Sequence, residues 1–195
     1  IAGGRFEDRL TGIILTELDA EVSIGDGGVN IERFTATSPN GGRLTATGGS
    51  ANPREGRIAI NIDNMRVANR PDARAQASGD LTLQWEGLNS SVTGDLNIIS
   101  ADVNIAQNPE AGIPTIDVVE INRPDQEDEI ADAPVVQRNH ATRLDVRVRA
   151  PGRVFTRGRG IEAEWRLDMR LAGTSARPLV YGEANLVRGQ LALSG

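Results

Sequence analysis

The residues able to do chemistry are scattered along this chain and do not gather into a catalytic set. The run Gly158-Arg-Gly160-Ile-Glu-Ala163 has the spelling of a dinucleotide-binding loop. That loop requires a helix directly after the turn, because the helix N-terminus faces the pyrophosphate. Residues 165–171 instead alternate apolar and polar side chains, which predicts a strand. We therefore interpret this run as a glycine-rich β-turn.

The sequence also gives no support for a metal site or a catalytic nucleophile. The acidic run Asp125-Gln-Glu127-Asp128-Glu129 lacks the ligand spacing and the turn glycine of a calcium loop, so we interpret it as a solvated loop. His140 is the single histidine and there is no cysteine, which excludes histidine clusters, zinc–thiolate sites and thiol catalysis. No G-x-S-x-G elbow accompanies the serines. We predict no metal, no cofactor and no enzymatic activity.

The charge balance argues against nucleic acid as a partner. The formal net charge is -6, and the 21 basic residues, all arginine, form no basic run that would follow a phosphate backbone. Five arginines share the polar positions of predicted strands with three acidic residues. These are Arg143, Arg147, Arg149, Arg166 and Arg170, with Asp145, Asp168 and Glu164. We expect cross-strand ion pairs on a wet face, with anion binding as the alternative.

The dominant pattern along the chain has a period of two. Apolar and polar residues alternate over residues 81–86, 144–149 and 165–171, and more weakly over 29–32, 58–63 and 92–98. Such alternation places one face of a strand in an apolar environment and the other in water. No helical period is sustained, so the chain is predicted to be all-β.

Tight turns should connect these strands. Gly25-Asp26-Gly27-Gly28 and Asn40-Gly41-Gly42 are hairpin signals, and short connections favour sequential antiparallel pairing. A repeat of glycine, polar residue and aliphatic residue opens several alternating stretches, and we interpret it as a series of similar hairpins. Its copies begin at Gly42, Gly56, Gly79, Gly94 and Gly189. The adjoining Ile98 and Ile99 shift the alternation, which predicts a β-bulge.

We treat residues 1–195 as a single segment of a longer protein. Residues 107–142 interrupt the β pattern with four prolines and the acidic run, and we predict an acidic, mobile insertion there. No window of 18 consecutive apolar residues is present, so no membrane-spanning helix is expected.

The apolar face of the predicted strands is the remaining functional candidate. Its ordinary interpretation is the core of a β-sandwich. Aromatic residues are only 3% of the chain, and no second, differently patterned set of strands is evident to cover the face. We therefore keep both an open apolar surface and a closed sandwich core as alternatives.

The C-terminal third carries a family resemblance. Residues 149–164, beginning Arg149-Ala-Pro151-Gly-Arg-Val-Phe155, and residues 171–191, beginning Leu171-Ala-Gly173-Thr-Ser, resemble signature stretches of the TamB family. The stretch that starts Arg66-Val-Ala-Asn-Arg-Pro71 is similar to upstream repeats of that AsmA-like family. The insertion at 107–142 matches no motif of the family.

The resemblance implies a fold and a function. The fold is an elongated antiparallel sheet curled into a U-shaped trough, the β-taco, with an apolar interior. The family's proteins are bridges across the periplasm of Gram-negative bacteria, anchored in the inner membrane by a segment outside these residues. They shield phospholipid acyl chains in a hydrophobic groove between the inner and outer membranes. The implied partner is TamA, an outer-membrane barrel of the Omp85 type.

The groove would be lined by alternating apolar residues of the predicted strands. We predict as lining residues Leu81, Leu83, Trp85, Leu96, Ile98, Leu144, Val146, Val148, Trp165, Leu167, Met169 and Leu171. The alternative function is a scaffold for outer-membrane protein (autotransporter) assembly together with TamA, in which a sheet edge or the groove holds a nascent strand.

Overall fold

The fold is all-β in the computed structural model, which describes residues 2–9, 11–25, 28–52, 54–105 and 141–192. The predicted insertion at 107–142, with the acidic run and His140, therefore lies almost wholly outside the described residues. Ten strands are present: β1 (Gly4–Asp8), β2 (Ile13–Gly25), β3 (Gly28–Thr37), β4 (Arg43–Asn52), β5 (Glu55–Asn69), β6 (Ala73–Glu86), β7 (Asn89–Asn104), β8 (Arg143–Gly158), β9 (Ile161–Thr174) and β10 (Arg177–Leu191).

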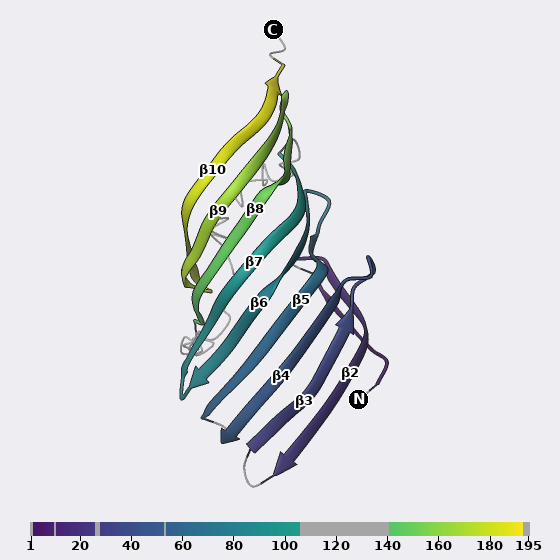
Figure 1. Ribbon diagram of the computed structural model, residues 1–195, viewed down its shortest axis with the longest axis vertical. Coiled ribbons are helices and arrows are strands. Elements are labelled where there is room, and N and C mark those ends of the chain that lie inside the picture. The colour runs from purple at the N-terminus through teal and green to yellow at the C-terminus, as the bar shows by residue number, and fades with distance from the viewer. Residues whose placement is uncertain (1, 10, 26–27, 53, 106–140, 193–195) are drawn as a thin grey trace, which may run out of the picture.

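The strands form one open, curled sheet in which their order in space follows their order in the chain (Figure 1). Every stretch predicted from alternation falls within a strand, which confirms the all-β prediction. The described residues contain no second sheet that could cover the first. The sandwich alternative therefore finds no support in this part of the chain.

Tight turns join most neighbouring strands, as predicted. Gly25 pairs with Gly28 at the end of the β2–β3 hairpin. Between β8 and β9 the turn residues Arg159 and Gly160 both have positive φ, 51° and 78°, which is typical of a type I′ turn. A strand follows this turn, so the glycine-rich β-turn is confirmed and the nucleotide-loop interpretation is excluded there.

One strand pair corrects the expectation of an entirely antiparallel sheet. β7 and β8 are parallel, with Val92 beside Leu144 and Leu96 beside Val148. A parallel pair needs a connection that returns to the starting end of the strand, usually a dozen residues or more. Residues 105–142 provide that length, whereas the other connections are only a few residues long.

The glycine-led repeat has a role within the sheet that its pattern did not predict. Gly79 and Gly94 lie inside β6 and β7, not at hairpin turns. Their φ angles are 158° and 144°, and an added Cβ at either position would lie about 2 Å from a carbonyl oxygen of the neighbouring strand, at 2.1 Å and 2.0 Å. These glycines therefore permit close approach of two strands in the middle of the sheet.

β-Bulges bend the sheet at several points. The predicted bulge is confirmed, because Gln76 pairs with Ser100 and Ala77 with Ile98, which leaves Ile99 unpaired in this ladder. A larger irregularity in β8 lies between Ala150 and Val154. Bulges increase local twist and curvature, which fits the curled outline of the sheet (Figure 1).

The N-terminal hairpin, formed by β1 and the first part of β2, folds back onto the sheet. The backbone N–H of Asn69, at the end of β5, donates to the carbonyl oxygen of Thr11 over 2.8 Å. Thr11 lies in the turn between β1 and β2. Its backbone N–H donates to the carboxylate of Asp8, the last residue of β1, over 3.1 Å. The hairpin thus contacts a strand three positions away in the sheet order.

Candidate functional site: an aliphatic face across the sheet

One face of the sheet carries a continuous row of apolar and glycine residues. Residues paired across neighbouring strands share a face, so the registers trace the row from strand to strand. It runs from β2 to β10 through Ala20, Phe34, Ala46, Ile60, Leu81, Gly94, Val146, Leu171 and Val180. Eight strand spacings correspond to about 38 Å. We call this side of the sheet the aliphatic face.

All twelve predicted lining residues lie on the aliphatic face. Leu81, Leu83 and Trp85 alternate along β6, and Leu81 pairs with Gly94, two positions from Leu96 in β7. The remaining members occupy the same side of β7, β8 and β9: Ile98, Leu144, Val146, Val148, Trp165, Leu167, Met169 and Leu171. The register therefore brings the set together. Contact of these residues with lipid stays a prediction.

The two tryptophans have specific local partners. The indole of Trp85 lies across Gly56 of β5, where an added Cβ would be 2.1 Å from the ring. The Nε1–H of Trp165 donates to Thr156 Oγ1 over 2.9 Å. Both side chains are half-buried, and each is positioned by a neighbouring strand.

Packing on the aliphatic face is incomplete. No large side chain of the described residues is fully buried, and the buried hydrophobic residues with zero exposure are three alanines, Ala36, Ala77 and Ala150. A sandwich core would instead bury large aliphatic side chains on all sides. Most of the predicted lining residues are half-buried, which is expected for a single layer whose side chains contact only their neighbours in the sheet.

Sequence reasoning missed one closed part of this face. Leu15, Ala36, Ile62 and Met65 form a buried cluster, in which the N-terminal hairpin covers β5. The alternation around Met65 is broken by Asp63 and Asn64, which lie side by side before it. That break in alternation was the one sequence signal of a change in packing at Met65. The curl of the sheet that brings Leu15 over Met65 depends on distant strands.

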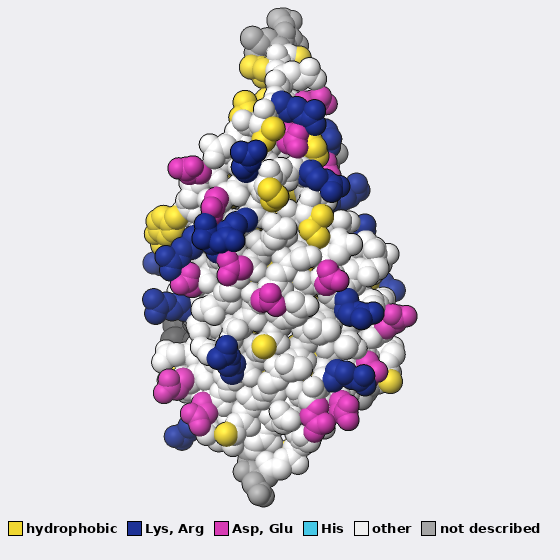
Figure 2. Space-filling view, viewed as in Figure 1, with side chains coloured by type: hydrophobic (Ala, Val, Ile, Leu, Met, Phe, Trp, Pro, Cys, Tyr) yellow, Lys and Arg dark blue, Asp and Glu magenta, His cyan; other side chains and the backbone are white. Residues whose placement is uncertain are grey.

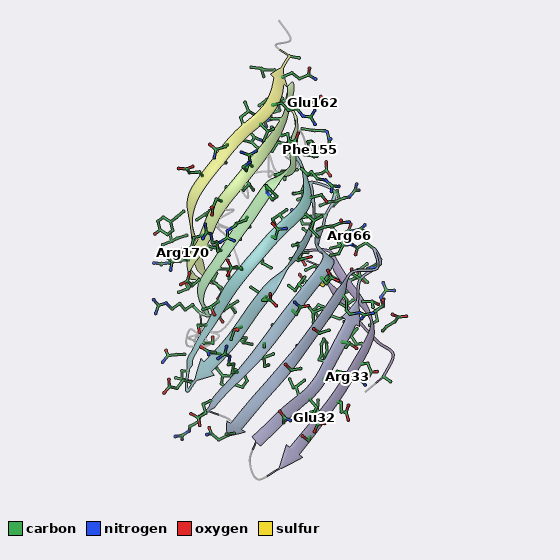
Figure 3. All side chains as sticks on the ribbon, viewed as in Figure 1. Glu32, Arg33, Arg66, Phe155, Glu162 and Arg170 are labelled. Carbon is green, nitrogen blue, oxygen red and sulfur yellow. The ribbon has the colours of Figure 1, made fainter. Side chains whose placement is uncertain are left out.

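The opposite face is charged, and its ion pairs follow the prediction. Arg147 contacts Asp168 over 2.8 Å, and Arg170 contacts Asp145 over 2.7 Å. Arg149 lies 3.7 Å from Asp95. Figure 2 shows basic and acidic side chains interspersed over this face, and Figure 3 labels Arg170 on it. Other members of the predicted set have different partners: Arg166 donates to the carbonyl oxygen of Pro151, and Glu164 pairs with Arg188 of β10.

Hydrogen bonds on the charged face perturb its ionisable groups. The side-chain hydrogen bond from Arg147 lowers the pKa of Asp168, and that from Arg170 lowers the pKa of Asp145. The same bonds raise the pKa of both arginines. A hollow of about 740 Å³ here is bordered by three arginines and three aspartates, Arg147, Arg149, Arg170, Asp95, Asp145 and Asp168. Balanced charge of this kind favours ion pairing over anion binding.

The described residues contain no group of three or more histidine, cysteine, aspartate or glutamate side chains placed to hold a metal ion. Within the same part of the chain no helix has the length and apolar character needed to cross a bilayer.

Comparison with models of protein families shows which family the chain belongs to. A sequence model described as the TamB C-terminal domain matches residues 32–195. The chain belongs to the TamB family. No curated protein and no solved structure matches it.

The TamB match has a clear relation to the strands. It begins within β3 and continues through β4 to β10, so all twelve predicted lining residues lie inside it. β1 and β2, which build the N-terminal hairpin, precede the TamB match. The hairpin therefore lies before the TamB match, whereas the aliphatic face lies within it except at β2, where the row begins with Ala20.

Proposed function

We propose that this chain is a periplasmic segment of a TamB-type bridge that shields phospholipid acyl chains during transport between the inner and outer membranes. The observation that carries the proposal is the continuous row on the aliphatic face, which crosses nine strands of a single-layer sheet. Membership of the TamB family supports it.

The aliphatic face has the dimensions and chemistry for this task. An acyl chain reaches about 15 Å, half the thickness of a bilayer's hydrocarbon core. A row of about 38 Å is therefore long enough for chains to pass from one strand to the next. Each CH₂ group removed from water contributes about 0.8 kcal/mol, so a chain moves along aliphatic side chains without entering water. In the working form, the curled sheet is a U-shaped trough, the β-taco, with this face as its interior.

The lining residues act passively in this proposal. They offer apolar surface without directional bonds, and the head group stays at the open, polar lip. No acid, base, nucleophile or cofactor takes part, so the protein is a carrier and not an enzyme.

From the family relationship we also propose a cellular location and a partner protein. The full-length protein is anchored in the inner membrane, spans the periplasm of a Gram-negative bacterium and meets TamA, the outer-membrane barrel. Phospholipid would then leave the aliphatic face near that barrel.

Two matched variants of the full-length protein test the proposal. Leu83→Arg places a charge on the aliphatic face, and Gln84→Arg places the same charge on the opposite face one residue away. We expect Leu83→Arg to reduce both the phospholipid that copurifies with the protein and its transfer between donor and acceptor vesicles. Gln84→Arg should leave both unchanged. Equal effects of the two variants, with both folded by circular dichroism, contradict the proposal.

A scaffold for outer-membrane protein assembly with TamA is the second candidate. The observation that favours it is β10, which pairs only with β9 among the described strands and exposes half or more of Leu179, Val180 and Tyr181. An unpaired strand edge accepts another strand through backbone hydrogen bonds. Loss of autotransporter assembly when proline replaces Glu183 in β10, together with indifference to Leu83→Arg, would support the scaffold.

A further inference from the structure

The N-terminal hairpin bends sharply where it leaves the sheet. The ladder of β2 with β3 shifts between Glu21 and Val22, and shifts again between Thr16, which pairs with Thr37, and Asp19, which pairs with Thr35. Glu17, within this interval, has a φ of 51°, a conformation that residues other than glycine adopt rarely. Its carboxylate accepts from Thr37 Oγ1 over 2.9 Å. The strand therefore bends at Glu17, and we call this bend the hinge. Thr16, just before it, still pairs with Thr37 of β3, and Gly4 of β1 pairs with Leu18 just after it, so the hinge has a paired base.

Beyond the hinge, the hairpin lies over the aliphatic face. Leu15 is only 9% exposed and packs in the buried cluster with Ile62 and Met65, which are 7% and 4% exposed. Ile13 in the hairpin and Leu18 directly after the hinge pack against the same cluster. The hairpin thus presents its own aliphatic side chains to β5.

The covered surface is part of the same aliphatic face. Ile62 pairs with Gly79, and the row continues through the predicted lining residues Leu96, Val148 and Met169. The hairpin therefore occupies at β5 the kind of surface that is left open at β7 to β10. Its aliphatic side chains stand where an acyl chain of similar chemistry would lie.

The attachment of the hairpin to β5 is local. A backbone hydrogen bond joins Asn69 to Thr11, and β1 pairs only with β2 among the described strands. The base of the hairpin stays on β3 through the pairing of Thr16 with Thr37. Gly12, with a φ of 69°, fits so closely that an added Cβ would lie 2.2 Å from the Asn69 carbonyl oxygen. A hinge at one end and a small, specific contact at the other are the features of a segment that can swing away as a unit.

We propose that the surface of β5 beneath the hairpin is an acyl-chain site and that the β1–β2 hairpin is its displaceable cover. The proposal rests on the lipid-carrying function given above. An acyl chain displaces Leu15 from Ile62 and Met65, and the hairpin returns when the chain moves on. Apolar contacts that the hairpin loses on opening are replaced by contacts between the acyl chain and the same residues.

A reversible disulfide tests the cover directly, because residues 1–195 contain no cysteine that would compete with the engineered pair. Thr11→Cys combined with Asn69→Cys places two cysteines on residues whose backbones already touch. The full-length double variant is incubated with phosphatidylethanolamine–phosphatidylglycerol vesicles containing a phospholipid with a photoreactive acyl chain. Labelled peptides are then mapped by mass spectrometry in the oxidised and reduced protein.

We expect labelling of β9 around Leu167 in both redox states and labelling of β5 around Ile62 only in the reduced state. If β9 is labelled and β5 is labelled equally in both redox states, or in neither state, the cover is overturned and the carrier function stands. Absence of labelling at both strands overturns the carrier function and the cover with it. A control disulfide between Thr82→Cys and Thr93→Cys, paired on the charged face, should change neither signal.

A second pair of variants opens the cover without cysteines. Gly12→Ala forces the hairpin away from Asn69 and leaves the apolar cluster unchanged in sequence. Gly3→Ala is its control, because Gly3 has a similar φ of 75° but no atom within 4 Å of an added Cβ. Increased labelling of β5 in Gly12→Ala relative to Gly3→Ala supports the cover, and equal labelling in the two folded variants overturns it.

Discussion

The register at the centre of the sheet makes a quantitative prediction about Gly94. The row on the aliphatic face passes through this residue, between Leu81 and Val146. Its φ is 144°, and an added Cβ would lie 2.0 Å from the carbonyl oxygen of Asp80. Gly94→Ala should therefore destabilise the protein much more strongly than an alanine at a glycine without neighbours.

The magnitude follows from two contributions. A residue other than glycine in such a backbone region costs about 1–3 kcal/mol. Relief of the contact with Asp80 also requires β6 and β7 to separate locally, which weakens neighbouring backbone hydrogen bonds worth about 0.5–1.5 kcal/mol each. We expect a total loss of about 3 kcal/mol or more in the free energy of unfolding.

Gly41 provides the matched control. It has a φ of 82° in the turn between β3 and β4, with no atom within 4 Å of an added Cβ. Gly41→Ala carries only the conformational cost, about 1–2 kcal/mol. The assay is urea denaturation followed by circular dichroism, with the two variants and the natural chain measured together. If Gly94→Ala is no more destabilising than Gly41→Ala, the β6–β7 register, and with it the continuous aliphatic row, is wrong.

Two other predictions concern the two faces of the sheet. Ile62→Asp buries a carboxylate within the closed cluster and should lower the free energy of unfolding by about 4 kcal/mol or more. Leu167→Asp, on the open part of the face, should leave the protein folded but impair lipid transfer. Denaturation curves and the vesicle assay distinguish the two variants, and unfolding by Leu167→Asp would indicate an ordinary core. Asp145 and Asp168 have lowered pKa values because arginine side chains donate to them, so their stabilisation is present above their unfolded pKa and is lost as the pH falls through the folded one. Urea midpoints measured between pH 7 and pH 3 should therefore fall less steeply below about pH 4 for Asp168→Asn than for the natural chain, and parallel curves would show that the ion pair contributes nothing.

Local pattern was sufficient to predict parts of six strands, β3 and β5 to β9, and the faces of their side chains. In a strand, side chains alternate between two sides, so the positions of Leu81, Leu83 and Trp85 are decided within one short segment. Pairing through β7 then placed these residues on the same face as Val146 and Leu171, because each strand presents its apolar side to that face. The ion pairs of the charged face follow from the same alternation.

Features that depend on distant parts of the chain were not predictable in this way. The parallel β7–β8 pair depends on the long connection at residues 105–142, whose length was visible but whose direction was not. Gly79 and Gly94 were predicted to open alternating stretches of successive hairpins; their role in close strand approach depends on the neighbouring strand and has no signature of its own in the sequence. Packing of Leu15 against Ile62 and Met65 requires the sheet to curl, and no local sequence pattern encodes that curl.

Site-specific photo-crosslinking in intact cells tests the central claim most directly. A photoreactive amino acid is placed in the full-length protein at Leu167, on the aliphatic face, or at Asp168, the next residue on the charged face. The account predicts phospholipid adducts at position 167 and none at position 168. Protein adducts at position 167, or no adduct at either position, would contradict a lipid-carrying face and would favour the scaffold or a closed core.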